Sequence, residues 1–224
     1  MRVSVEESAF ATNDRIAAET RRRLAERRVL AVNLLSAPGS GKTSLLEATI
    51  DRLRNAVRIG VIEGDVATTR DADRVAAHGV PAVQVNTEML SATCHLDARM
   101  VAQALERLPS DRLDLLLIEN VGNLVCPAAF DLGEDLKVAV LSVTEGDDKP
   151  VKYPKLFREA AVTLISKMDL LPHCGGDVEA IVANLRAVQP AAEIIRTSVR
   201  TGEGLDAWAE WLHQRWTAKC RSAD

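Results

Sequence analysis

The chain has 224 residues, of which 47% are hydrophobic, so it can bury one sizeable core and we expect one main domain. Its formal net charge of −4 leaves no basic excess for contacts with phosphates, which argues against a nucleic-acid partner. No apolar run approaches the roughly 20 residues of a membrane span, and residues 1–28 lack the apolar core of a secretory signal. We therefore expect a cytoplasmic protein with no membrane partner.

The first segment, residues 6–28, is rich in charge and carries a thin apolar stripe of Phe10, Ala17 and Leu24. This pattern predicts an exposed helix that docks on the rest of the chain. The predicted organisation has three parts: an N-terminal helical appendage (1–28), a single domain (29–216) and a C-terminal tail (217–224).

From residue 29 onward, apolar runs typical of buried strands alternate with helical patterns. The strand-like runs lie at 29–35, 57–64, 81–85, 113–119, 136–143, 161–166 and 192–198, and the helical patterns at 43–53, 69–79, 96–108, 151–160, 177–188 and 204–216. This alternation predicts right-handed crossovers and an α/β fold, in which helices flank both faces of a mostly parallel sheet. The ligand crevice of such a sheet lies at the C-terminal ends of its strands.

The segment SAPGSGKT at 36–43, directly after the first strand-like run, matches the GxxxxGKS/T pattern of a phosphate-binding loop, with serine in place of the first glycine. Gly39 and Gly41 allow successive N–H groups to turn towards a phosphate, Lys42 reaches the β/γ oxygens, and the Thr43 hydroxyl joins a magnesium shell. The alternative is a plain strand-to-helix turn. The predicted nucleotide contacts of the loop are Pro38, Gly39, Ser40, Gly41, Lys42, Thr43 and Ser44.

Two acidic residues, Asp65 and Glu119, come at the ends of two further strand-like runs. At this edge of a nucleotide-binding sheet, carboxylates hold magnesium or order an attacking water. A solvated acid is an equally good interpretation of either residue alone, but two acids at the same edge as Lys42 favour function. We therefore predict Lys42, Asp65 and Glu119 as catalytic residues and Thr43, Asp65 and Glu119 as Mg²⁺ ligands.

The segment LISKMDLL at 164–171 resembles the NKxD element of GTPases. In that element the aspartate, here Asp169, accepts two hydrogen bonds from guanine, and the lysine stem, here Lys167, lies along the ring. Adenine would leave the carboxylate without a donor, so we expect selection of GTP over ATP. Ser166 replaces the usual asparagine, and we expect the loop to lose one bracing contact. Ser198, in a later segment that resembles the loop closing over the base, is predicted to help.

Cys94, His95 and Cys126 form a second informative set. Thiolate and imidazole ligands suit Zn(II) or Ni(II), and three of them fall short of a closed four-coordinate shell. A two-fold related copy of the chain could complete it. The competing interpretation is that the cysteines are buried apolar residues and that His95 caps a helix. A further pair, His173 and Cys174, falls in an expected surface loop, where we assign no function.

Together these segments resemble the hydrogenase maturation GTPases that deliver nickel, the HypB family. The resemblance spans about residues 29–215, and its most specific parts are CHLDA at 94–98 and ENVGNLVCPA at 119–128. It implies a dimerising P-loop GTPase of the SIMIBI class that hydrolyses GTP slowly and binds Ni(II) or Zn(II). With a second nickel metallochaperone, it helps to load the large subunit of nickel-iron hydrogenase.

The resemblance also assigns roles to residues of this chain. The metal site corresponds to Cys94, His95 and Cys126. The nucleotide site corresponds to Gly39, Gly41, Lys42, Thr43, Asp65, Glu119, Lys167 and Asp169. Because Glu119 and Cys126 share one loop, we expect GTP to favour the dimer and reshape the metal site, and hydrolysis to loosen it.

Three other functions stay open. A urease-type nickel GTPase is disfavoured because its Cys-Pro-His motif is absent while CHLDA is present. A kinase built on the same phosphate loop is disfavoured by the SKMD element at 166–169. The third is a metal-binding module that uses GTP only as an assembly ligand, which slow single-turnover hydrolysis would distinguish from a GTPase.

Overall fold

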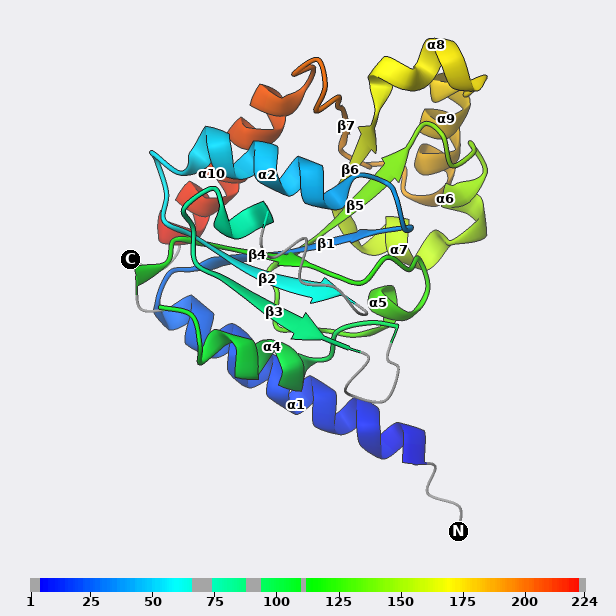
Figure 1. Ribbon diagram of the computed structural model, residues 1–224. Helices are drawn as coiled ribbons and strands as arrows, with labels where there is room; N and C mark the ends of the chain where they lie inside the picture. The colour runs from blue at the N-terminus through cyan, green and yellow to red at the C-terminus, as the bar shows by residue number, and fades with distance from the viewer. Residues whose placement is uncertain (1–4, 66–73, 88–93, 110–111, 222–224) are drawn as a thin grey trace.

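The computed structural model describes residues 5–65, 74–87, 94–109 and 112–221, and its core is one seven-stranded sheet (Figure 1). The strand order is β3-β2-β4-β1-β5-β6-β7, and the pairings are parallel. The strands are β1 (Leu30–Ser36), β2 (Ile59–Asp65), β3 (Ala82–Asn86), β4 (Leu115–Glu119), β5 (Leu136–Ser142), β6 (Ala160–Ser166) and β7 (Ile194–Arg196). The expected α/β fold with a parallel sheet is confirmed.

The helices connect and cover these strands. They are α1 (Val5–Glu26), α2 (Lys42–Leu53), α4 (Ala98–Leu105), α5 (Cys126–Ala129), α6 (Lys149–Lys152), α7 (Pro154–Glu159), η3 (Met168–Leu170), α8 (Leu171–Cys174), α9 (Val178–Val188) and α10 (Leu205–Arg221). Residues 69–73 of the helix expected at 69–79 lie outside the described residues, and of the described part 74–76 are helical and 77–79 form a turn. No helix in the described part of the chain combines the length and apolar composition that a membrane crossing requires.

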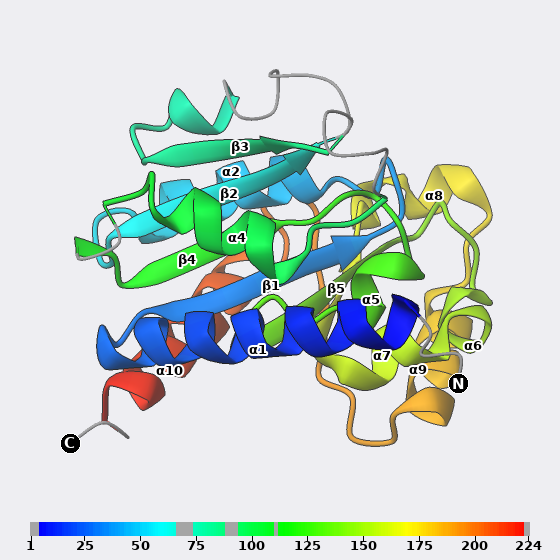
Figure 2. The same cartoon turned by 90° about the horizontal axis from the view of Figure 1, so that it is seen from below.

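Both faces of the sheet are covered (Figures 1 and 2). Alternate residues of β1 point to opposite faces, as in any strand. Leu30, Val32 and Leu34 pack in the layer of α2 and α10, whereas Ala31 packs with α1 and α4, and Leu35 packs with α7 and α9. This two-sided burial explains why β1 is apolar on both faces, apart from Asn33 and Ser36.

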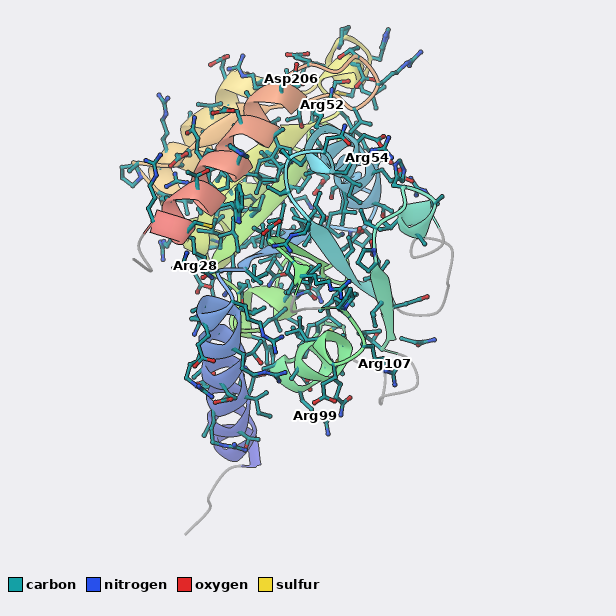
Figure 3. The ribbon with its side chains drawn as sticks, turned by 90° about the vertical axis from the view of Figure 1, so that its left-hand side faces the viewer. Arg28, Arg52, Arg54, Arg99, Arg107 and Asp206 are labelled. Atoms are coloured by element: carbon teal, nitrogen blue, oxygen red, sulfur yellow. The ribbon has the colours of Figure 1, made fainter. Side chains whose placement is uncertain are left out.

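The layer of α2 and α10 is also joined by polar contacts. Arg52 near the end of α2 donates to Asp206 near the start of α10 at 2.8 Å (Figure 3). In the interior, the indole of Trp208 donates to the Thr49 hydroxyl at 2.9 Å. α2 therefore leaves the phosphate-binding loop as a helix that is fixed along its length.

α1 packs against the sheet side that α4 also covers (Figure 2). Ala17 and Leu24 of the expected apolar stripe are buried, while Phe10 is 42% exposed. α1 also buries two polar side chains, Asn13 and Thr20. The three-part division of the chain stays a prediction.

The prediction of a single helix at 151–160 is wrong. α6 ends at Lys152 and α7 begins at Pro154, with Tyr153 between them at φ −125° and ψ 54°. Proline disfavours helical angles at the residue before it, so the helix must stop at Tyr153. Pro154 then occupies the first turn of α7, where its missing N–H has no partner to lose.

Candidate functional site

A cavity of about 550 Å³ lies at the C-terminal ends of β1, β2 and β4. It is lined by Pro38, Gly39, Gly41, Lys42, Thr43, Ser44, Glu63, Gly64, Arg74, Glu119, Asn120, Val121, Gly122 and Lys167. Gly39 and Gly41 have φ angles of 75° and 93°, in the region that favours glycine. At Gly122 a Cβ atom would lie 2.9 Å from the Pro38 Cα, so the loop after β4 depends on glycine to approach the phosphate-binding loop.

Lys42 begins α2 and is only 7% exposed. Its Nζ donates to the Ser36 hydroxyl at 2.8 Å, so the serine that departs from the usual first glycine holds this ammonium. Ser40 is fully buried and donates to the Ala37 carbonyl at 2.6 Å. Only the backbone of Ser40, and not its side chain, can therefore face a phosphate.

Two of the predicted Mg²⁺ ligands, Thr43 and Glu119, line this cavity. The Thr43 hydroxyl donates to the Glu119 carboxylate at 2.9 Å. Asp65 is the last residue of β2, and its side chain lies outside the described part of the structure. The structure adds Glu63, which is 1% exposed, lines the cavity and is the register partner of Glu119. Sequence reasoning missed Glu63 because it lies inside an apolar strand-like run.

A second cavity of about 310 Å³ shares Gly41, Ser44 and Lys167 with the first. Lys167 donates from Nζ to the Gly39 carbonyl at 2.6 Å, and Ser198 donates to the Asp169 carboxylate at 2.6 Å. The predicted base-binding residues thus adjoin the phosphate cavity. They leave a hollow beside Asp169 that is lined by the phosphate-binding loop, the first turn of α2, the end of β6, η3 and the loop after β7.

Ser166 braces the phosphate-binding loop. Its hydroxyl donates to the Ser40 carbonyl at 2.8 Å, in a buried position. Ser166 therefore still braces this loop, and the expected loss of one contact relative to asparagine stays a prediction. The shorter side chain reaches this loop because β6 ends directly beside it.

Cys94, His95 and Cys126 each offer a ligand atom, and these atoms all lie within 4.8 Å of one another. In the described part of the chain, this is the one group of three or more His, Cys, Asp or Glu side chains placed to hold a metal ion. Cys94 is exposed, and the other two are half-buried. The set mixes two soft thiols with an imidazole, as nickel and zinc sites do.

Different local structures present these three residues. Cys94 and His95 precede α4, which starts at Ala98 with Asp97 as its N-cap, accepting from Met100 N at 2.7 Å. Cys126 is the first residue of α5. The N-cap fixes the bend at 94–97, and the cap role considered for His95 is filled by Asp97.

Burial and neighbouring groups shift the pKa of two of these three side chains. Burial lowers the pKa of His95, against a weaker opposite effect of Asp97, which favours the neutral imidazole that binds metals. The hydrogen bond with Cys94, followed by burial, raises the pKa of Cys126. The two thiols therefore resist ionising together until a cation is present.

An aromatic stack packs against His95 of the metal cluster, and no sequence pattern predicts it. The rings of His95 and Phe130 are stacked, with centroids 3.9 Å apart, and Phe10 of α1 stacks on the other side of Phe130 at 5.0 Å. Phe10, the exposed end of the apolar stripe of α1, therefore reaches towards the metal cluster.

His173 and Cys174 lie in the short helix α8 instead of the expected loop, and both are exposed. Pro172 at the start and Gly175 at φ 64° after the end frame this single helical turn. Neither residue joins a potential metal group within the described residues.

Comparisons with known proteins agree with this geometry. Residues 30–196 match the family of CobW/HypB/UreG nucleotide-binding domains. The hydrogenase maturation factor HypB of Escherichia coli strain K12 is 53% identical over 218 residues, which are 97% of this chain and 73% of that protein.

Solved structures give the same result for the fold. The crystal structure of HypB from Helicobacter pylori in complex with nickel superposes with a TM-score of 0.87 at 36% identity, covering 92% of this chain and 96% of that chain. The signal recognition particle receptor FtsY from Elizabethkingia anophelis, at 14% identity and a TM-score of 0.54, shares the fold alone, over 82% of this chain and 65% of its own.

Proposed function

Because the chain belongs to the HypB family of hydrogenase maturation factors, we propose that it is a nickel-handling GTPase for the maturation of nickel-iron hydrogenase. GTP is bound and hydrolysed at the ends of β1, β2 and β4, and Ni(II) or Zn(II) is carried by Cys94, His95 and Cys126. The observation that carries this proposal is the metal cluster. Two distant segments of the chain bring two thiols and one imidazole within 4.8 Å of one another.

In the nucleotide pocket, the N–H groups of the phosphate-binding loop hold the phosphates and Lys42 supplies a positive charge at the β/γ oxygens. Asp169 accepts the two guanine donors, with Ser198 holding one carboxylate oxygen. Asp65, at the end of β2, orders the attacking water. We expect slow turnover, as for a switch rather than a metabolic enzyme.

The donors at the pocket edge fit Mg²⁺. The Thr43 hydroxyl and the Glu119 carboxylate are hard oxygen ligands 2.9 Å apart, and Asp65, at the end of β2, is a second acidic residue that could join them. When bound, Mg²⁺ neutralises charge on the transferring phosphate. Lys42 and the loop amides hold the same phosphate from the other side.

Nickel is the cargo of this protein, and the site is built to release it. Cys94 is exposed, and Val125 beside Cys126 is 58% exposed, so the cluster faces outward. Three ligands leave one position of a tetrahedral shell to a group from outside. We propose that a second copy of the chain supplies it in a GTP-promoted homodimer, and that the accepting protein later replaces it.

The partners follow from this cargo. We propose that a second nickel metallochaperone and the hydrogenase large subunit receive or pass on the metal, in the cytoplasm. The exposed thiol of Cys94 is the ligand that an incoming protein meets first.

The experiment measures both activities of one preparation. Phosphate release is followed with GTP and with ATP, with Lys42→Ala as the control for contaminating hydrolases. Nickel bound per chain is measured by equilibrium dialysis for the wild type and for Cys94→Ser/Cys126→Ser, together with mass in solution under GDP and a non-hydrolysable GTP analogue.

We expect the protein to hydrolyse GTP but not ATP. The wild type should bind nickel and the double variant should not. The mass in solution should be larger with the GTP analogue than with GDP. Equal nickel binding by the wild type and the double variant would overturn the metal site. If the wild type binds GTP but releases no more phosphate than Lys42→Ala does, then GTP serves only as an assembly ligand and the protein is not a GTPase.

A further inference from the structure

A buried side chain lies between the two sites. Asn120 follows Glu119 directly, is 1% exposed and lines the phosphate cavity. Its Oδ1 accepts from Leu96 N at 3.1 Å and from Val121 N at 3.0 Å. Leu96 is the residue after His95, so a single side chain joins the strand end that carries Glu119 to the backbone of the metal-binding loop at 94–97.

Asn120 also reaches the other metal-bearing segment. Its Nδ2 donates to the Asn33 Oδ1 at 3.3 Å, and the Asn33 Nδ2 donates to the Glu134 Oε1 at 3.2 Å. The second oxygen of Glu134 accepts from Leu132 N at 2.7 Å. Leu132 lies in the segment after Cys126, two residues beyond Phe130. We call Asn120, Asn33 and Glu134 the buried relay.

The relay is placed where a change in the phosphate cavity reaches it. Glu119 is held by Thr43 of the phosphate-binding loop, and Gly122 lies against Pro38 of the same loop. The segment 119–122 is therefore fixed to the loop on both sides of Asn120. A change in that loop moves the side chain that holds Leu96 N.

We propose that Asn120 is a positioning residue that transmits the nucleotide state to the metal cluster through Leu96 and through Asn33 and Glu134. The inference rests on the proposed function, because it names the connection between its two sites. Buried polar side chains are costly unless every partner is satisfied, and a satisfied chain has few alternative arrangements. A small shift at one end therefore displaces the other end instead of dissipating.

The structure provides a matched control. Asn13 of α1 is 7% exposed and holds the same two metal-bearing segments: its Oδ1 accepts from Ala98 N at 2.9 Å, and its Nδ2 donates to the Asp131 carbonyl at 2.8 Å. Asn13 does not line the phosphate cavity. Loss of Asn13 should loosen the metal cluster equally in every nucleotide state, whereas loss of Asn120 should remove the difference between states.

The test uses the full chain and measures the Ni(II) dissociation constant by competition with a chromophoric chelator, once with GDP and once with a non-hydrolysable GTP analogue. The readout is the ratio of the two constants. Couplings between sites usually amount to about 5- to 150-fold. We expect such a ratio for the wild type and for Asn13→Ala, and a ratio below about 2 for Asn120→Ala.

Asn120→Asp covers the case in which Asn120→Ala does not fold. Aspartate keeps the acceptor for Leu96 N and Val121 N but cannot donate to Asn33, so we expect a ratio reduced below that of the wild type. A folded Asn120→Ala with the wild-type ratio, or an unchanged ratio in Asn120→Asp when the alanine variant is unfolded, would overturn the relay.

The outcomes separate the relay from the function on which it rests. A wild-type ratio of 1 with normal binding of nickel and GTP overturns the relay but leaves both sites in place. Absence of nickel binding at the Cys94, His95 and Cys126 cluster overturns the proposed function itself. Because coupling is reciprocal, nickel must change the ratio of the affinities for the GTP analogue and for GDP by the same factor, which checks each ratio independently.

Discussion

The nucleotide pocket and the metal cluster differ in how completely the chain builds them. Around the pocket, distant segments are tied to one another by protein hydrogen bonds: Lys167 to Gly39, Ser166 to Ser40, and Ser198 to Asp169. Around the metal cluster, the buried contacts lie on the side of the ligands that faces the protein interior. The other side faces solvent, and Cys94 is exposed there.

The difference teaches what each site has to do. A pocket whose walls already hold one another costs little to order when its substrate binds, which favours selective binding of one nucleotide. A cluster of three ligands that is open to solvent can hand a metal on, because the fourth ligand comes from outside the chain and an incoming protein can replace it. The predictions below separate the two regions, beginning with the largest effect.

Asp169→Asn should change the base preference of the pocket without touching the metal cluster. The amide can donate where the carboxylate accepted, so guanine loses its partner and xanthine gains one. A site that recognises a base through such bonds discriminates by roughly 10⁴-fold, and we expect a preference for XTP over GTP. The measurement is the ratio of kcat/KM for the two nucleotides.

The matched control for this change is Asp177→Asn. Asp177 caps α9 by accepting from Ala180 N at 3.0 Å, and asparagine caps helices equally well. The control should keep the preference for GTP. Unchanged GTP selectivity in Asp169→Asn would show that the base binds elsewhere.

Lys42→Ala should lower the rate of GTP hydrolysis by about 10²- to 10³-fold, the usual loss when one group that stabilises transition-state charge is removed. The nickel affinity of the nucleotide-free protein should stay the same, because Lys42 contacts Ser36 and not the cluster. Single-turnover phosphate release and chelator competition measure the two quantities.

Lys155→Ala is the control for Lys42→Ala, since Lys155 lies exposed on α7 beside Glu159. It should hydrolyse GTP at the wild-type rate. A Lys42→Ala protein that retains more than a third of the wild-type rate would contradict the assignment of this lysine.

The sequence predicted the fold and the phosphate-binding loop well because their signals are local. Apolar runs, glycines at positive φ and the order strand, loop, helix all appear within about ten residues of one another. The residue pattern across 151–160 predicts one helix, whereas Pro154 disfavours helical angles at Tyr153 and breaks it there.

The support of the candidate site could not be predicted in this way. Asn13 bonds to Asp131 and Ala98, which are 118 and 85 residues away, and no periodicity connects such positions. Glu63 and Glu119 become neighbours only through the register of β2 and β4. The sequence predicts the types of ligand and their spacing. The side chains that hold these ligands in place come together only through tertiary packing.

Cys126→Ser should weaken nickel binding by more than about 100-fold, beyond the 10- to 100-fold that supporting groups contribute. A serine hydroxyl stays neutral and is a poor ligand for a borderline-soft ion. The GTP affinity of the metal-free protein should be unaffected. Nickel-thiolate absorbance and chelator competition report the loss.

Cys220→Ser supplies the control for thiol loss as such, because Cys220 is half-buried on α10 and belongs to no metal cluster in the described residues. Its nickel affinity should equal that of the wild type. Equal weakening by both substitutions would mean that the metal binds wherever a thiol is available.

Phe130→Leu should give the smallest effect and the finest comparison of the two sides of the metal cluster. Leucine keeps an apolar side chain behind His95 but removes the ring 3.9 Å from the imidazole. Aromatic stacking is worth about 0.5–1.5 kcal/mol, so nickel affinity should fall roughly 2- to 12-fold. GTP hydrolysis should not change, because Phe130 does not line the pocket.

Phe10→Leu distinguishes the effect of the Phe130 ring from the effect of the helix α1 that packs against it. It removes the outer ring of the stack at 5.0 Å and leaves the contact between Phe130 and His95 intact, so nickel affinity should stay within about 2-fold. If both variants lost affinity equally, the docking of α1 rather than stacking on the imidazole would hold His95. The metal cluster would then depend on a helix that the nucleotide pocket does not touch.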